Sequence, residues 1–187
     1  MKIKSFIVYK LIPAIVILSL LGILVVINVQ GIKNDKKAEE LLRYDYFNSF
    51  CLETFSGDVF SEANLSDYNV TIINAWGPYC DACLREMPML NKLSREYADK
   101  KVAIVGIQAD SFLFPEDIEL SRSQIAEMGI EYQNLLADGD FNQKIAGMLN
   151  NSLPGTWIVD SNGNILDFFP GTKTEKEWRE ILNLYAE

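Results

Sequence analysis

Two cysteines, Cys80 and Cys83, follow closely on a run of apolar and β-branched residues, Val70–Ala75. Such a run predicts a strand that is buried on both faces, and the pattern after it predicts a helix over residues 81–99. The strand then delivers Cys80 to the amino end of the helix, and Cys83 follows one turn later. Thiols at these two positions can form a disulfide with small adjustment. The sequence therefore predicts a buried strand, a dithiol and a helix, in that order.

The places of the two thiols predict different roles for them. The free N–H groups and the dipole at a helix amino end favour a thiolate, so Cys80 is expected to be the exposed, attacking sulfur. Cys83 is expected to be the resolving thiol, which closes the intramolecular disulfide and releases the substrate. A C-x-x-C pair beside a strand–helix–strand pattern indicates redox chemistry. Half of a metal site is the weaker reading, because the chain has no His and three Cys in all. We therefore expect neither a metal nor a cofactor.

The rest of the chain from residue 49 alternates strand and helix patterns. Further strands are expected at residues 50–54, 59–61, 102–108, 132–136, 156–159 and 164–169, and further helices at 115–128, 140–149 and 174–186. Turn residues at 56–58 and 160–163 indicate two hairpins, and Thr174 with Glu177 forms the pattern of a capping box. This order implies an α/β domain whose mixed sheet is covered on both faces.

The first 32 residues predict a transmembrane helix. Between Leu11 and Val29 only Ser19 and Asn28 are clearly polar, and about 20 apolar residues suffice to cross a bilayer. The apolar run is longer than that of a cleaved signal peptide, so an uncleaved signal-anchor at 1–32 is expected, with a cleaved signal as the alternative. Residues 33–48 read as a linker or stalk, and residues 49–187 as the soluble domain.

The charge and the missing histidines exclude several functions. The chain carries a net charge of -9, and from residue 34 onward it has 13 basic and 26 acidic residues. A general nucleic-acid binder needs a basic face, so no nucleic-acid partner is expected. Without His the chain cannot form a Ser-His-Asp triad or a Cys-His protease pair.

The segment Asn74–Pro88 resembles the active-site segment of the TlpA/ResA group, which are membrane-anchored, extracytoplasmic, thioredoxin-like proteins. The residues at matching positions are Trp76, Cys80, Cys83, Glu86 and Pro88. The resemblance extends over about residues 50–185 and includes the segment 153–160. It implies a thioredoxin-like fold with an N-terminal β-hairpin, preceded by one transmembrane helix. It also implies a single-pass protein of the cell membrane, with its domain on the extracytoplasmic side.

The resemblance implies roles for the residues around the dithiol. Pro154 matches the cis-proline that faces the dithiol, which would leave the backbone of Leu153 free to pair with an extended substrate. Glu86 matches an acidic residue that can exchange a proton with the thiols; the alternative is a solvated helix carboxylate. Trp76 and Tyr79 are expected to form an apolar, substrate-binding surface beside the dithiol.

Three residues call for separate expectations. Asp81 places a negative charge beside Cys80, which is expected to stabilise the disulfide and to lower the reduction potential, as suits a reductant. Gly155, where the group often has Thr, is expected to open space beside Pro154. Cys51 is expected to be a small buried side chain, with a regulatory or intermolecular thiol as the alternative.

These observations predict a membrane-tethered, extracytoplasmic thiol-disulfide oxidoreductase. By resemblance it would reduce disulfides of exported proteins, for example in cytochrome c maturation or in the repair of oxidative damage. Its reductant would be a membrane thiol-electron carrier of the CcdA/DsbD kind. The alternatives are a disulfide-forming oxidant, a thiol peroxidase of the peroxiredoxin type and a membrane-tethered binding module. The peroxidase pattern expects Thr or Ser at the position of Gly77.

Overall fold

The computed structural model describes residues 45–109, 117–150 and 152–186. The transmembrane segment predicted at 1–32 lies outside the described residues, as does most of the predicted linker. Among the residues that are described, no helix combines the length and the apolar character that a membrane span requires. The described domain begins at Asp45.

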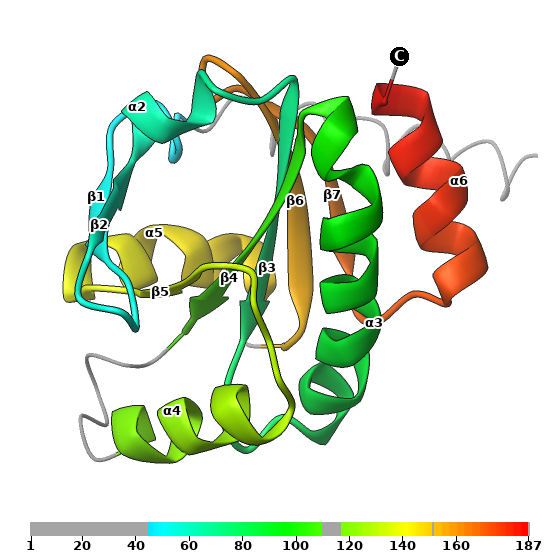
Figure 1. Cartoon of the computed structure of the whole chain (residues 1–187). Coiled ribbons are helices and arrows are strands. Elements are labelled where there is room, and N and C mark those ends of the chain that lie inside the picture. The colour runs from blue at the N-terminus through cyan, green and yellow to red at the C-terminus, as the bar shows by residue number, and fades with distance from the viewer. Residues whose placement is uncertain (1–44, 110–116, 151, 187) are drawn as a thin grey trace, which may run out of the picture. The chain divides into compact units, whose positions relative to one another are not determined.

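A five-stranded mixed sheet forms the centre of this domain, with the strand order β5-β4-β3-β6-β7 (Figure 1). Its strands are β3 (Val70–Trp76), β4 (Val102–Gln108), β5 (Asn134–Leu136), β6 (Gly155–Asp160) and β7 (Ile165–Pro170). β3, β4 and β5 are parallel to one another, whereas β6 and β7 run antiparallel to their neighbours. The predicted mixed sheet is thus confirmed, and its central strand β3 is the one that leads to the dithiol.

Helices cover both faces of the sheet, as Figure 1 shows. The helices are α3 (Asp81–Tyr97), the 3-10 turn η1 (Ala98–Lys100), α4 (Asp117–Glu127), α5 (Gly139–Leu149) and α6 (Glu175–Tyr185). Side chains of β3 alternate between two apolar clusters. Ile73 packs in a cluster with Phe141 of α5, and Ile72 packs in the other with Leu90 of α3 and Leu182 of α6. A strand whose two faces are both buried explains why most of Val70–Ala75 is apolar or β-branched.

A short hairpin precedes the sheet, as predicted. β1 (Cys51–Glu53) pairs antiparallel with β2 (Val59–Ser61), and the one-turn helix α2 (Glu62–Leu65) follows. An isolated bridge between Thr54 and Leu135 links the hairpin to β5. The capping box at the start of α6 is also present, since Thr174 and Glu177 each accept a backbone N–H of the other residue. Both features follow from local sequence.

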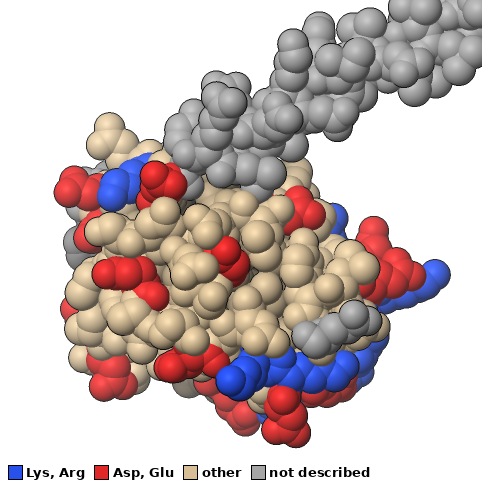
Figure 2. All heavy atoms as spheres, turned by 90° about the horizontal axis from the view of Figure 1, so that it is seen from above, with Lys and Arg blue, Asp and Glu red and all other residues tan. Residues whose placement is uncertain are grey.

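The chain enters the domain at the end of the sheet that lies opposite the dithiol. Val70, the first residue of β3, pairs with Asp160 next to the β6–β7 turn. In that turn Gly163 has φ 84°, and a Cβ there would lie 2.4 Å from the carbonyl oxygen of Phe47. Only glycine therefore fits against the entering chain. Figure 2 shows this end, where acidic side chains lie scattered among uncharged ones and a row of basic side chains lies along one edge.

Candidate active site

The two cysteines form a disulfide at the amino end of α3. Their Cα atoms are 5.2 Å apart. Cys80 is the N-cap residue of the helix, and its Sγ accepts the backbone N–H of Cys83 at 3.2 Å. Cys80 is half-buried, whereas Cys83 is fully buried in the apolar cluster beneath α3. After reduction, Cys80 is therefore the more accessible sulfur, and the helix amino end supplies the N–H group that favours its thiolate.

The loop before β6 lies against the turn that leads to the dithiol. The Leu153–Pro154 peptide bond is cis. The Cδ1 atom of Leu153 lies 3.3 Å from the place that a Cβ on Gly77 would occupy. Gly155 follows and pairs with Ala75 at the end of β3. Leu153 and Pro154 are therefore close to the dithiol turn, although Leu153 lies 73 positions after Cys80 in the sequence.

The two aromatic residues before Cys80 differ in exposure. Tyr79 is 75% exposed, as expected for a surface beside the dithiol. The expectation for Trp76 is wrong, because its side chain is fully buried and packs against the Phe55 ring at a centroid distance of 6.3 Å. Ile72 and Trp76 lie on the same face of β3, so the Trp76 side chain packs in the core under α3. Of these two side chains, only that of Tyr79 is exposed at the surface.

The side chain of Glu86, a residue of α3, is buried, so the alternative of a solvated helix carboxylate is wrong. It is 4% exposed. Its Oε1 accepts the indole N–H of Trp178 at 2.9 Å and the backbone N–H of Lys173 at 3.0 Å, while its buried Oε2 has no hydrogen-bond partner among the described residues. Burial raises the pKa of the Glu86 carboxyl, although these two hydrogen bonds oppose the rise. Since Glu86 lies one turn after Cys83 on the same helix, a carboxyl with a raised pKa shares a helix face with the buried thiol.

Three polar residues of this interior were not predicted from the sequence. Asn74 and Thr156 lie opposite each other on β3 and β6, and Asn74 Nδ2 donates to Thr156 Oγ1 at 2.9 Å. Tyr132 is buried, and its pKa is raised mainly by burial and further by the charge of Glu86. One signal was visible in the sequence: Asn74 interrupts an otherwise apolar strand. Its partner could not be identified without the strand register.

Two further expectations are wrong. Gly155 opens no space, because a Cβ there would lie 2.4 Å from Leu149 and 3.2 Å from Phe168; the backbone there is packed against side chains. Cys51 is not buried but exposed and free. The reason is the alternation of β1, in which Leu52 takes the inward face and leaves Cys51 on the outward one. Cys51 belongs to the hairpin and not to the dithiol site.

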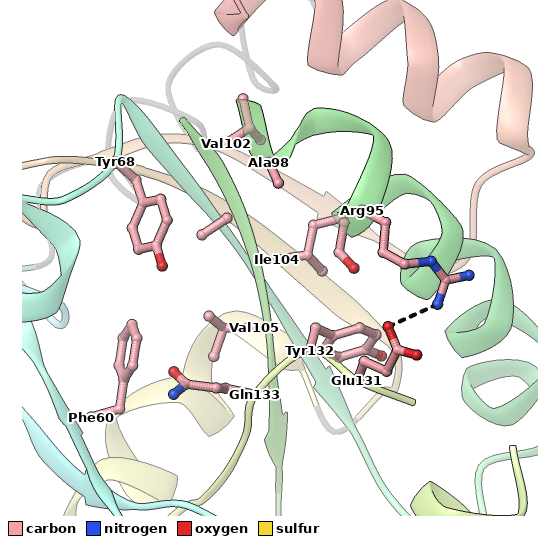
Figure 3. A pocket seen from close by; sticks show the side chains of 12 residues that line it. Phe60, Tyr68, Arg95, Ala98, Val102, Ile104, Val105, Glu131, Tyr132 and Gln133 are labelled. Atoms are coloured by element: carbon pink, nitrogen blue, oxygen red, sulfur yellow. Dashed lines mark hydrogen bonds and ion pairs between the residues drawn. The ribbon is translucent and has the colours of Figure 1, made fainter. Parts of the chain in front are cut away.

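A pocket of about 390 Å³ lies away from the dithiol (Figure 3). It borders the first half of β4, with Phe60 and Tyr68 on one side and the end of α3 on the other. Arg95 and Glu131 form an ion pair of 3.1 Å at its rim. Neither redox cysteine lines this pocket. Within the described residues no group of His, Cys, Asp and Glu could hold a metal ion, so the dithiol remains the chemically distinctive site.

Glu86→Gln is expected to change how stability depends on pH. Burial raises the pKa of Glu86 in the folded chain. The stabilisation that comes from its neutral form is therefore fully present below the pKa that Glu86 has in the unfolded chain. It is lost as the pH rises through the folded pKa. A glutamine cannot ionise, and the variant should therefore gain stability relative to the original chain as the pH rises above about 4. Denaturant unfolding of both oxidised proteins at several pH values measures this; a difference that does not vary with pH would contradict it.

Comparisons with known proteins bear on this site. Residues 45–168 match the sequence profile of the AhpC/TSA family. The chain is 33% identical over 143 residues to the thioredoxin-like protein YneN of Bacillus subtilis, which covers 72% of this chain and 75% of YneN. It is 32% identical over 138 residues to the thiol:disulfide interchange protein DsbE of Pseudomonas fluorescens, and the match covers 73% of this chain and 71% of DsbE. It is 28% identical over 106 residues to the thiol-disulfide oxidoreductase ResA of Bacillus thuringiensis, and the match covers 56% of this chain and 57% of ResA.

Solved structures share the fold. A thiol:disulfide interchange protein of Chlorobium tepidum superposes with a TM-score of 0.64 at 21% identity, covering 74% of this chain and 94% of that one. A secreted disulfide oxidoreductase of Mycobacterium tuberculosis gives a TM-score of 0.60 at 20% identity, covering 75% and 99%. At these identities the likeness establishes the thioredoxin-like fold that the sequence predicted.

Proposed function

Because this chain belongs to the AhpC/TSA family, among its TlpA/ResA-like redoxins, we propose that it is a membrane-tethered reductant of disulfides in exported proteins. That the chain is a thiol-disulfide oxidoreductase follows from its named relatives and its thioredoxin-like fold. The direction, the membrane tether and the substrates are our proposal. The observation that carries it is the disulfide at the amino end of α3, in which one sulfur is accessible and the other is buried.

The proposed reaction starts from the reduced dithiol. The Cys80 thiolate attacks one sulfur of a substrate disulfide; the substrate S–S bond breaks, a mixed disulfide forms and one substrate thiolate leaves. Cys83 then loses its proton and attacks the Cys80 sulfur. The mixed disulfide breaks, the second substrate thiol leaves, and the Cys80–Cys83 disulfide closes. Two electrons have passed to the substrate. A thiol donor of the CcdA/DsbD kind is proposed to return the protein to its reduced state.

Three residues beside the dithiol are proposed to assist these steps. Glu86 would accept the proton of Cys83, since its buried carboxyl lies one turn along the same helix and has a raised pKa. Leu153 would offer its backbone to an extended substrate segment, because its side chain lies against Gly77 of the turn that leads to the dithiol. Tyr79 would supply an exposed aromatic surface next to Cys80.

The membrane tether is proposed from the apolar segment between Leu11 and Val29. A span of this length and composition can cross a bilayer. The printed names of the relatives ResA and DsbE describe thiol-disulfide exchange, and the matches span between 57% and 75% of the three relatives compared. A domain that reduces exported proteins would need to face the extracytoplasmic side, which is the side we propose.

The reduction potential of the Cys80–Cys83 pair tests the proposed direction. Equilibration of the full chain with glutathione or dithiothreitol should give a value near or below that of thioredoxin, about -270 mV. Asp81, an exposed residue of the first turn of α3, opposes the thiolate, so Asp81→Asn should raise the potential by roughly 10–30 mV. A value near about -120 mV would instead identify a disulfide-forming oxidant. Turnover of hydrogen peroxide by the same protein would favour the peroxidase alternative.

A further inference from the structure

Two side chains of α4 hold the two residues that precede Cys80. Gln124 Nε2 donates a hydrogen bond to the carbonyl oxygen of Pro78 at 3.0 Å. The hydroxyl of Tyr79 donates to Asp117 Oδ1 at 2.8 Å. Asp117 and Gln124 are two helical turns apart, so they lie on the same face of α4. This face of α4 therefore contacts the segment that carries the attacking sulfur.

The segment held in this way is a tight turn. The backbone N–H of Cys80 donates to the carbonyl oxygen of Gly77 at 3.1 Å, which closes the turn from within. Pro78, at its second position, has a fixed φ and no N–H of its own. The hydrogen bond from Gln124 fixes the carbonyl in the middle of the turn from outside. The orientation of the turn, and with it the place of the Cys80 sulfur, thus depends on α4.

Packing alone does not explain these contacts. Tyr79 is 75% exposed, and its hydroxyl donates a charge-assisted hydrogen bond to the Asp117 carboxylate. The Oε1 atom of Gln124 is buried and has no partner among the described residues. Leaving such an atom unpaired costs free energy. The Gln124 side-chain amide thus keeps its oxygen unpaired while its N–H group donates to the Pro78 carbonyl.

We propose that Asp117 and Gln124 are positioning residues for thiol-disulfide exchange. Gln124 fixes the turn from which Cys80 attacks. Asp117 fixes the Tyr79 ring, whose face then contacts an apolar side chain of the substrate next to the substrate's disulfide. This inference rests on the proposed function and adds two residues of α4 to those that support the exchange reaction. The reaction itself is unchanged, since neither residue exchanges a proton or an electron.

Gln124→Met and Asp117→Ala, in the full chain, test the proposal. Methionine keeps the length of Gln124 but cannot donate to Pro78. The reduced Gln124→Met variant should reduce insulin and oxidised glutathione about three- to tenfold more slowly than the original chain, as loss of one positioning hydrogen bond implies. Asp117→Ala should slow the reduction of insulin more than that of glutathione, because only a protein substrate covers the Tyr79 ring. Asp117→Asn keeps an acceptor for the Tyr79 hydroxyl and should restore most of the rate.

Ser123→Ala is the matched control on the same helix. It removes an exposed hydrogen bond to Glu127 and leaves the Pro78–Tyr79 turn untouched, so its exchange rates should equal those of the original chain. The proposal is overturned if Gln124→Met and Asp117→Ala react at the original rate, or if their rates fall only together with their melting temperatures and Asp117→Asn restores nothing. If the original chain itself reduces neither probe, the proposed function fails instead.

Discussion

Replacing Cys80 with serine is expected to abolish disulfide exchange, with a fall in rate of roughly a thousandfold or more. Cys80 is the accessible member of the pair, and its sulfur accepts the N–H of Cys83 at the helix amino end. A serine hydroxyl is not ionised near neutral pH and cannot form the mixed disulfide. Reduction of insulin by the full chain, in the presence of dithiothreitol as electron source, measures the loss.

Cys83→Ser should give a different defect. Cys80 can still attack, but no resolving thiol follows, so the substrate should stay bound through a mixed disulfide that gel electrophoresis without reductant reveals. Cys51→Ser is the matched control, because Cys51 is free, exposed and located on the hairpin; it should retain the original activity. An active Cys80→Ser variant, or a Cys51→Ser variant as inactive as Cys80→Ser, would refute the assignment of the dithiol.

Trp178→Ala is expected to cause the largest loss of stability, about 3–5 kcal/mol in the free energy of unfolding. The indole is fully buried and packs against the Phe169 ring at a centroid distance of 6.0 Å. Its N–H also donates to Glu86 Oε1, so truncation leaves a cavity and removes a donor from a buried carboxyl. Urea unfolding of the oxidised protein measures the loss.

Trp178→Phe separates these two effects. Phenylalanine fills much of the space but cannot donate to Glu86, so a smaller loss of about 1–3 kcal/mol is expected, together with a further rise in the pKa of Glu86. Leu184→Ala on the same helix is the control, since Leu184 is 76% exposed and its truncation should change stability by less than about 0.5 kcal/mol. Equal stability of Trp178→Ala and Leu184→Ala would contradict the role assigned to Trp178.

Local sequence predicted the elements whose signals are local. The apolar run of β3, the hairpin turn before Val59 and the capping box at Thr174 each depend on neighbouring residues, and each is observed. The dithiol could be placed for the same reason, because the strand, the cysteines and the helix are contiguous. The position of the Leu153–Pro154 loop came from resemblance and not from any local signal.

Contacts between distant segments could not be predicted. The partners of Glu86, which are Lys173 and Trp178, lie 87 and 92 residues along the chain, and nothing in the helix pattern of α3 showed that this carboxylate points inward. Trp76 was misjudged because a strand's last residue can face the core or the solvent. The contacts of Asp117 and Gln124 with the turn depend on the placement of α4, which the sequence pattern leaves undetermined.

The packing of Gly163 against Phe47 fixes the end of the domain at which the preceding polypeptide is attached. β3 spans about 20 Å between that end and the dithiol. A domain immobilised on a bead or a sensor surface through its amino end is therefore held by the end remote from Cys80 and presents the reactive sulfur to the solution. Attachment through Tyr79 or through α4 would instead bury the reactive end against the support. Kinetic measurements on immobilised protein should accordingly use the amino-terminal attachment.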